Sequence, residues 1–138
     1  MADFKNCVEI QVRFNDIDML GHVSNTVYLN YFDTGKSSYM EEVVKDYDFS
    51  TEAMVEASVK IDFFEPVFMK ARIVVLTRVT KLGNKSFTFE HQLVDADTHK
   101  IHAMCTAIMV CFNPKKQESI LIPDSWREKI QKYEGLEE

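Results

Sequence analysis

Five stretches of the chain have the hydrophobic pattern of β-strands. In chain order they are residues 7–14, 55–63, 71–82, 85–94 and 101–112. The first, second and fourth alternate between apolar and polar side chains, the third is long and β-branched, and the fifth is almost wholly apolar. An apolar run of this length favours a central place in a sheet. The pair Gly83-Asn84 predicts a tight hairpin between the third and fourth strands.

The alternation also predicts which side chains face the core. In the first strand the inward residues are Val8, Ile10, Val12 and Phe14. In the second strand they are Val55, Ala57, Val59, Ile61 and Phe63. Successive side chains of a strand point to opposite faces, so each set lines one face of the sheet.

A helical period replaces the alternation from Thr26 onward. Apolar side chains recur every three or four residues on one side, at Val27, Tyr28, Tyr31, Phe32, Gly35, Tyr39 and Val43. Ser24 or Asn25 is the natural N-cap, and the helix is expected to end near Lys45. A glycine inside a helix costs about 1 kcal/mol relative to alanine. Gly35 therefore indicates that the middle of this helix is pressed closely against a sheet.

The last predicted element is a short amphipathic helix within residues 123–133, where Ser125 and Glu128 have the spacing of a capping box. Together these elements predict an α+β protein in which a five-stranded antiparallel sheet wraps around one long helix, as a single domain over residues 1–138. Such a sheet leaves exposed edges, and pairing between two copies would remove one of them. We therefore expect a homo-oligomer, a dimer or a tetramer, with a cleft at its seam.

Composition narrows the function classes. The 138 residues suffice for one hydrophobic core, with 46% hydrophobic and 28% charged residues. The formal net charge of -6 argues against a general nucleic-acid binder. The N-terminus lacks the pattern of a signal peptide and no segment approaches the roughly 18 apolar residues of a membrane span, so we expect a cytoplasmic protein that does not cross a membrane. The three cysteines, Cys7, Cys105 and Cys111, are interpreted as small buried hydrophobes.

The polar segment between the first strand and the long helix carries the candidate chemistry. It holds Asp16, Asp18, Gly21 and His22 and leads directly into the helix. The free N–H groups at a helix start, with the positive end of the helix dipole, can stabilise the negative charge that a thioester carbonyl gains when it is attacked. A nearby carboxylate can attack the carbonyl or take a proton from water. The pattern indicates acyl transfer and leaves both roles open.

The motif DIDMLGHVSNTVYLNYF resembles the hot-dog-fold thioesterases of the 4-hydroxybenzoyl-CoA thioesterase type, which carry a DxDxxGHVxN segment at the start of the central helix. The segments DFFEPVFMKARI and KLGNKSFTFEHQL, and the closing IP before a short helix, follow in the family's order. The resemblance implies hydrolysis of an acyl-CoA or acyl-carrier-protein thioester, with no cofactor other than the CoA of the substrate.

The resemblance also implies site residues. The catalytic carboxylate falls on Asp18, and the backbone amide that polarises the thioester carbonyl falls on Asn25. Contacts to the pantetheine and nucleotide fall on Lys85 and Ser86 in the hairpin turn. At Ser24 the sequence departs from the asparagine that many members have.

Each candidate has a second interpretation. Asp18 has the position of an Asx-turn residue, and Asp16 is interpreted as structural, bonding loop amides. His22 is interpreted chiefly as a turn or wall residue that orients a neighbour, with holding a water as its catalytic alternative. Asp33, eight residues after Asn25 and on the same helix face, is the second-choice carboxylate or a buried polar group bonded across a dimer.

Two other functions remain open on the same fold. One is a module that binds acyl-CoA or lipid without catalysis. The other is an enoyl hydratase or dehydratase, which carries a D-x-N-P-x-H segment; Asp18 and His22 are one residue too close for it, and the proline is absent. The histidines show no HxH or HxxxH spacing, so no metal site is expected. Lys81, Lys85, Lys115 and Lys116 are the basic side chains that could meet CoA phosphates.

Overall fold

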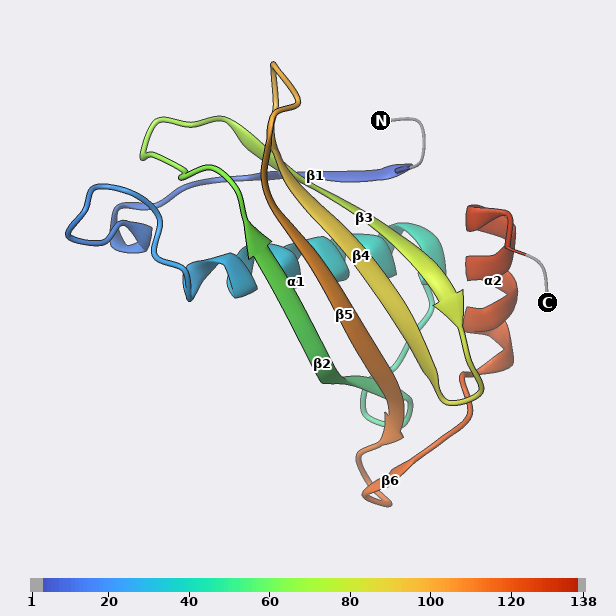
Figure 1. Cartoon of the computed structure of the whole chain (residues 1–138). Helices are drawn as coiled ribbons and strands as arrows, with labels where there is room; N and C mark the ends of the chain where they lie inside the picture. The colour runs from blue at the N-terminus through green and yellow to red at the C-terminus, as the bar shows by residue number, and fades with distance from the viewer. Residues whose placement is uncertain (1–3, 137–138) are drawn as a thin grey trace.

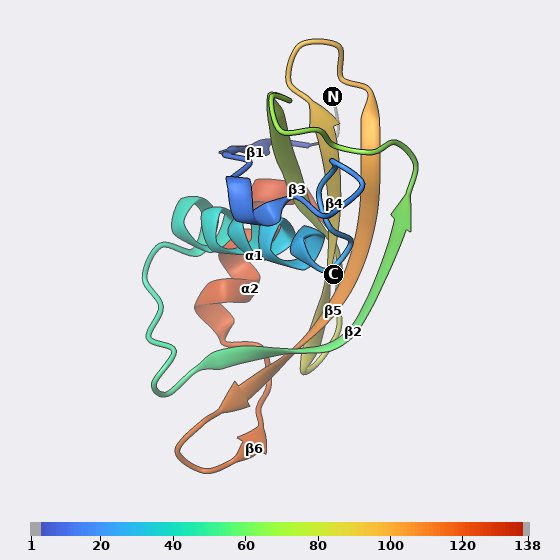
Figure 2. The ribbon, with the colours of Figure 1, turned by 90° about the vertical axis from the view of Figure 1, so that its left-hand side faces the viewer.

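A curled antiparallel sheet forms the centre of the protein, and a long helix lies against its concave face (Figures 1 and 2). The computed structural model describes residues 4–136. The strands are β1 (Asn6–Ile10), β2 (Ala53–Phe63), β3 (Ile73–Leu82), β4 (Ser86–Asp95), β5 (Ile101–Asn113) and the two-residue β6 (Glu118–Ser119). The helices are α1 (Val27–Tyr39), which a π-helical turn (Met40–Val44) continues, and α2 (Asp124–Glu134); a short 3-10 turn covers Phe14–Asp16.

The strand order is β1-β3-β4-β5-β2, with β6 paired to β5. All pairs are antiparallel, as the pattern of the chain predicted. Both helices lie on the same side of the sheet (Figure 2), so the α+β architecture with five main strands, one long helix and a short C-terminal helix is confirmed. None of the helices within residues 4–136 is long and apolar enough to cross a membrane.

The first strand is shorter than predicted. β1 ends at Ile10, which pairs with Ile73, the first residue of β3, so no partner strand continues beyond it. Val12 is still buried, but Phe14 is 81% exposed and begins the 3-10 turn. The prediction that Phe14 faces the core is therefore wrong. Cys7 is also exposed, contrary to prediction, because it alternates along β1 with Asn6, Val8 and Ile10, which are buried or partly buried, and so points to the opposite face.

β2 differs from its prediction because of a β-bulge. The register shifts between Glu56 and Ser58, where β2 pairs with β5, and this turns Val55 to the convex face and Glu56 to the concave one. After the bulge, Val59 and Phe63 do point to the concave face. They nevertheless remain 40% and 47% exposed, because α1 packs mainly on β1, β3 and β4 and covers β2 only in part.

The long helix begins and ends close to the predicted places. It starts at Val27 after Thr26, and neither Ser24 nor Asn25 caps it; the Ser24 hydroxyl is instead 3.3 Å from that of Thr26. The helical run ends at Lys45, which has a positive φ of 66°, as expected. The buried side of α1 comprises Tyr28, Tyr31, Phe32, Gly35, Lys36 and Tyr39.

The C-terminal helix begins one residue before the predicted cap. Asp124 is its first residue, and no side chain caps it, so the predicted box between Ser125 and Glu128 does not form. Glu134, the last residue of α2, connects the C-terminal end of this helix to the sheet. One carboxylate oxygen accepts hydrogen bonds from the Tyr39 hydroxyl at 2.7 Å and from the Val79 N–H at 2.8 Å. Val79 lies at a bulge of β3, so this carboxylate satisfies an amide close to the irregular pairing.

Beneath α1, the sheet buries a histidine. His91 stacks on Phe32 and Phe89, and its Nδ1 is 2.8 Å from the Thr77 hydroxyl. Burial, with a smaller effect of the Lys36 charge, lowers the pKa of His91 to about 3. The thiols of Cys105, which pairs with His91, and of Cys111 are buried as predicted, and burial raises the pKa of each to about 12, which makes them poor nucleophiles.

The buried histidine makes stability depend on pH. An unfolded histidine takes up a proton near pH 6.5, whereas folded His91 resists protonation down to about pH 3. Acidification through this window therefore favours the unfolded chain, by about 1.4 kcal/mol per pH unit from this group. We expect the urea midpoint to fall across this window less steeply in His91→Gln than in the wild type. The exposed His99 provides the control, because His99→Asn should keep the wild-type slope; equal slopes in all three proteins would contradict the assignment.

Candidate active site

The segment before α1 folds into a tight turn. Ile17 and Val23 form an antiparallel bridge, and inside it the N–H of Asp18 donates to the carbonyl of His22 at 2.9 Å. The N–H of Gly21 donates back to the carbonyl of Asp18 at 3.1 Å. Gly21 has a φ of 87°, a conformation that favours glycine. The motif thus brings both ends of the segment together in front of the helix.

The side chain of Asp18 is held by its own turn. Its Oδ1 accepts hydrogen bonds from the N–H groups of Leu20 at 2.9 Å and His22 at 3.4 Å, which is the Asx-turn geometry. Its Oδ2 is 3.8 Å from Nδ1 of His22, and about a third of the side chain is exposed. A carboxylate with one oxygen fixed and the other accessible can accept a proton or attack an electrophile. The turn role and a catalytic role are therefore compatible in one side chain.

Asn25 lies at the N-terminus of α1. The first backbone bonds of this region run from Val27 N–H to Ser24 O at 2.9 Å and from Tyr28 N–H to Asn25 O at 3.3 Å. Within residues 4–136, the N–H of Asn25 donates to no acceptor. An unsatisfied amide at the positive end of a helix is suited to bind a developing oxyanion.

His22 forms part of the wall beside the turn. Its backbone bridges to Phe68, its ring meets the Phe68 ring edge-on at 6.0 Å, and the next residue, Val23, donates to the carbonyl of Val67 at 2.8 Å. These contacts dock the turn on the loop between β2 and β3. They match the interpretation of His22 as a wall residue that orients its neighbours, and its catalytic alternative stays a prediction.

Asp33 is not brought to the Asp18 turn. It is eight residues beyond Asn25, about 12 Å along the helix axis, and its side chain is 65% exposed. Its Oδ1 is 3.1 Å from Nζ of Lys36, which also contacts Glu56 of β2 at 2.5 Å. Burial opposes the charge of Lys36, but the two carboxylates outweigh it and raise the lysine pKa. Within one chain, Asp33 therefore belongs to an ion-pair cluster between α1 and β2.

Lys85 and Ser86 lie at the far end of the molecule. They follow the β3–β4 turn beside α2, whereas the Asp18 turn is at the opposite end of α1 (Figure 1). Nζ of Lys85 is 3.5 Å from the Ser119 hydroxyl, and Lys85 borders an open cavity of about 630 Å³ near β6. One chain thus does not assemble the predicted substrate contacts with the predicted catalytic group.

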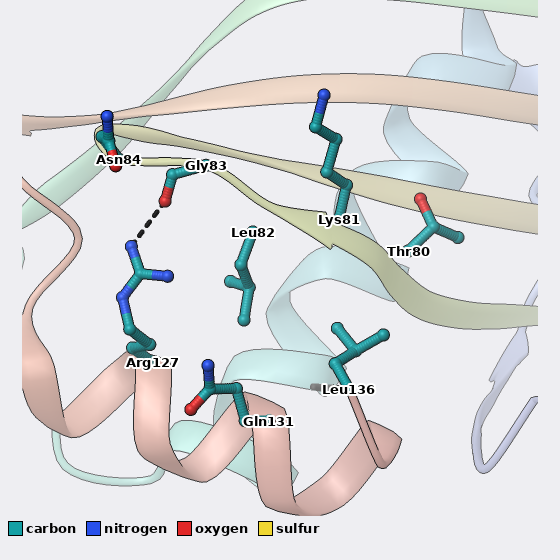
Figure 3. A pocket seen from close by; sticks show the side chains of 8 residues that line it. All are labelled: Thr80, Lys81, Leu82, Gly83, Asn84, Arg127, Gln131 and Leu136. Atoms are coloured by element: carbon teal, nitrogen blue, oxygen red, sulfur yellow. Dashed lines mark hydrogen bonds between the residues drawn. The ribbon is translucent and has the colours of Figure 1, made fainter. Parts of the chain in front are cut away.

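A second cavity, of about 360 Å³, lies on the other side of the same turn, between the hairpin and α2 (Figure 3). Lys81 and Asn84 line it from the hairpin, and Arg127 and Gln131 line it from α2. Arg127 donates a hydrogen bond to the Gly83 carbonyl at 2.5 Å. The sequence interpretation missed Arg127 and Gln131, although their spacing of four residues places them on one helix face.

Among residues 4–136, no group of three or more histidine, cysteine, aspartate or glutamate side chains is arranged to hold a metal ion.

Comparison with known proteins identifies the family. Residues 12–130 match the model of the thioesterase-like superfamily. The chain is 26% identical over 133 residues to the acyl-acyl carrier protein thioesterase ATL3, chloroplastic, of Arabidopsis thaliana, covering 94% of this chain and 69% of that protein. It is similar to two solved structures at 26% identity. One is the Pseudomonas aeruginosa protein PA5185, with a TM-score of 0.86 and coverage of 95% of this chain and 92% of that one.

The other solved structure is a thioesterase from Thermus thermophilus in complex with coenzyme A and Zn, with a TM-score of 0.85 and coverage of 99% of this chain and 100% of that one. The hot-dog fold expected from the resemblance is therefore confirmed, and so is thioester hydrolysis as the general activity. The chain belongs to the thioesterase-like superfamily.

Proposed function

We propose that the protein is an acyl-CoA thioesterase in which Asp18 is the nucleophile or general base and the Asn25 amide is the oxyanion site. The observation that carries this proposal is the partly exposed Asp18 carboxylate in a turn that leads directly to an unsatisfied amide at the start of α1. The coenzyme A in the similar Thermus thermophilus thioesterase supports CoA as the thiol half of the substrate.

The chemistry requires only substrate and water. The Asn25 N–H would receive the thioester carbonyl oxygen and bind it more strongly as it becomes negative. The Asp18 carboxylate would then attack the carbonyl carbon, releasing CoA thiolate and forming an anhydride that water hydrolyses to the free acid and the restored carboxylate. Alternatively, it would take a proton from a water that attacks the carbonyl directly and displaces the thiolate. Because a thiol has a pKa of about 8.5, its thiolate leaves without a strong acid to protonate it.

We also propose that the working enzyme is a homo-oligomer, a dimer or a tetramer, in which two copies are joined at their β2 edges. In the part of the chain that the structure describes, β2 pairs with β5 on one side only, and its concave face presents the exposed Val59 and Phe63. A two-fold axis through paired β2 edges would reverse the ends of the two copies. The partner's Lys85 and Ser86 would then approach the Asp18 turn and supply the contacts that one chain cannot.

The same interface between the two β2 edges could bind the acyl group. The ring of Phe63 meets that of Tyr28 on α1 edge-on at 5.0 Å, so the apolar strip of β2 continues onto the first turn of the helix beyond Asn25. An acyl chain bound with its carbonyl at Asn25 would lie along this strip, which the second copy would close.

A charge on the β2 edge should separate the copies. We expect Val59→Lys to convert a dimer to a monomer in sedimentation equilibrium and to lower hydrolysis at least tenfold, because a lysine in the seam is buried without a partner. Ile108→Lys, also at an exposed apolar residue but on the convex face, should keep the β2-joined dimer. A wild-type monomer with full activity would contradict the dimer proposal.

Thiol release tests the activity itself. Acyl-CoAs of graded chain length, benzoyl-CoA, phenylacetyl-CoA and matching acyl-carrier-protein thioesters are incubated with the protein, and free thiol is measured with a thiol reagent. Hydrolysis of the CoA esters supports the proposal, and hydrolysis of the carrier-protein esters alone would assign the other donor. No release, with CoA-ester binding in calorimetry, would favour the non-catalytic binding module.

A further inference from the structure

The buried carboxylate of Asp16 connects the candidate turn to α1. Asp16 is 3% exposed, and its Oδ2 accepts hydrogen bonds from the Tyr31 hydroxyl at 2.7 Å and from the Arg13 N–H at 2.9 Å. The Arg13 guanidinium is 3.6 Å from Oδ1 on the solvent side. Burial first, and then the contact with Asp16, raise the pKa of Tyr31, so the phenol stays protonated and donates to the carboxylate.

The backbone of Asp16 holds the other end of the same turn. Its carbonyl accepts a hydrogen bond from the N–H of Ser24 at 2.9 Å, and the Ile17–Val23 bridge follows directly. Ser24 precedes Asn25, whose amide is the proposed oxyanion site. Asp16 therefore contacts the helix through its side chain and the end of the turn through its main chain.

The local contacts of Asp18 do not place it relative to the helix. Among the described residues 4–136, its side chain bonds only to Leu20 and His22, both inside the turn. The position of the whole turn over α1 must come from other contacts, and the Asp16 contact to Tyr31 joins the two elements directly. Tyr31 lies six residues beyond Asn25, about 9 Å along the axis, so the bond anchors the turn to a rigid part of the helix.

We propose that Asp16 and Tyr31 are positioning residues, which set the distance between the Asp18 carboxylate and the Asn25 amide. This inference rests on the proposed function, because it assigns Asp16 and Tyr31 a role in the same reaction. Neither residue touches the substrate; both act by holding the turn in register with α1. A misplacement of about 1 Å between reacting groups can cost a hundredfold in rate, so a buried hydrogen bond at this junction has a kinetic effect beyond its effect on stability.

The chain offers a matched control for this test. Tyr39 is also buried in α1 and its hydroxyl also donates to a carboxylate at 2.7 Å. However, Tyr39 lies at the C-terminal end of α1, away from the Asp18 turn, and its partner is Glu134 of α2. Tyr31→Phe and Tyr39→Phe therefore remove the same chemical group from the same type of bond. Thermal midpoints measure the stability lost in each, and steady-state thiol release separates kcat from KM.

We expect Tyr31→Phe to lower kcat about tenfold to a hundredfold with less than about a threefold change in KM, and Tyr39→Phe to keep kcat within about threefold of wild type despite a similar fall in thermal midpoint. Asp16→Ala should lose kcat as Tyr31→Phe does, and Asp16→Asn, whose amide oxygen can still accept from Tyr31, should recover most of that loss.

Two results would overturn the inference, and they are distinguishable. Unchanged kcat in Tyr31→Phe, or equal losses in the two tyrosine variants, would reduce the Asp16 bond to a purely structural contact while leaving the thioesterase proposal intact. A wild-type protein that hydrolyses no thioester of the panel would reject the proposed function and the positioning role together.

Discussion

Asp18→Asn should lower thioester hydrolysis a hundredfold or more while the protein stays folded. Asparagine has the same shape as aspartate, and its side-chain oxygen can still accept from the N–H groups of Leu20 and His22, so the turn is preserved. The variant loses only the negative charge that attacks the carbonyl or accepts the proton of water. Removal of such a group typically costs several kcal/mol of the barrier. Initial rates of thiol release and circular dichroism of both proteins provide the measurement.

Variants of two further aspartates test whether the loss of activity is specific to Asp18. Asp33→Asn alters the second-choice carboxylate, and Asp62→Asn alters an exposed carboxylate that forms an ion pair with Lys60. We expect both to retain far more activity than Asp18→Asn. If Asp18→Asn kept full activity and Asp33→Asn lost it, the catalytic role would move to the α1 carboxylate and its ion-pair cluster with Lys36.

The fold could be predicted from the sequence where periodicity alone determines the structure. The helical spacing from Val27 to Val43 marked the central helix, and the glycine within it marked the contact with the sheet. The failures occur where the chain departs from a regular period. The bulge between Glu56 and Ser58 turns Val55 to the other face, and nothing in the alternation of β2 shows where an extra residue enters.

For the candidate site as well, the sequence indicated the residues of a local motif but not those whose roles depend on distant parts of the fold. Asp18, His22 and Asn25 lie within eight consecutive residues, so one local motif indicated all three, and one local turn holds Asp18 against His22. Lys85 lies at the other end of the sheet. Its proposed role requires a second copy joined at the β2 edge, and no local pattern encodes such an association. Arg127 was missed because a polar residue on an amphipathic helix resembles any solvated one.

Any side chain at Gly35 should destabilise the protein, and substitution at this position should have the largest effect on stability. A Cβ atom at this position would lie 2.6 Å from Cγ1 of Val75, 2.8 Å from the Thr77 hydroxyl oxygen and 3.3 Å from Nδ1 of His91. The first two distances are closer than non-bonded atoms approach, and Val75 and Thr77 are β-branched side chains of a buried strand with little freedom to move. The close contact between α1 and β3 therefore requires glycine.

Gly35→Ala gives the sharper test, because helix propensity and packing predict opposite changes in the free energy of unfolding. On an uncrowded helix, Gly→Ala stabilises by about 1 kcal/mol. At Gly35 we expect it to destabilise by about 1–3 kcal/mol, since overpacking outweighs propensity, and Gly35→Leu should leave too little stability for the native fold. Urea unfolding of both variants measures this, with Ser37→Leu at an exposed position of α1 as the control. A higher urea midpoint in Gly35→Ala would mean that α1 has room to move away from the sheet, and the close approach of helix and strand would no longer explain the glycine.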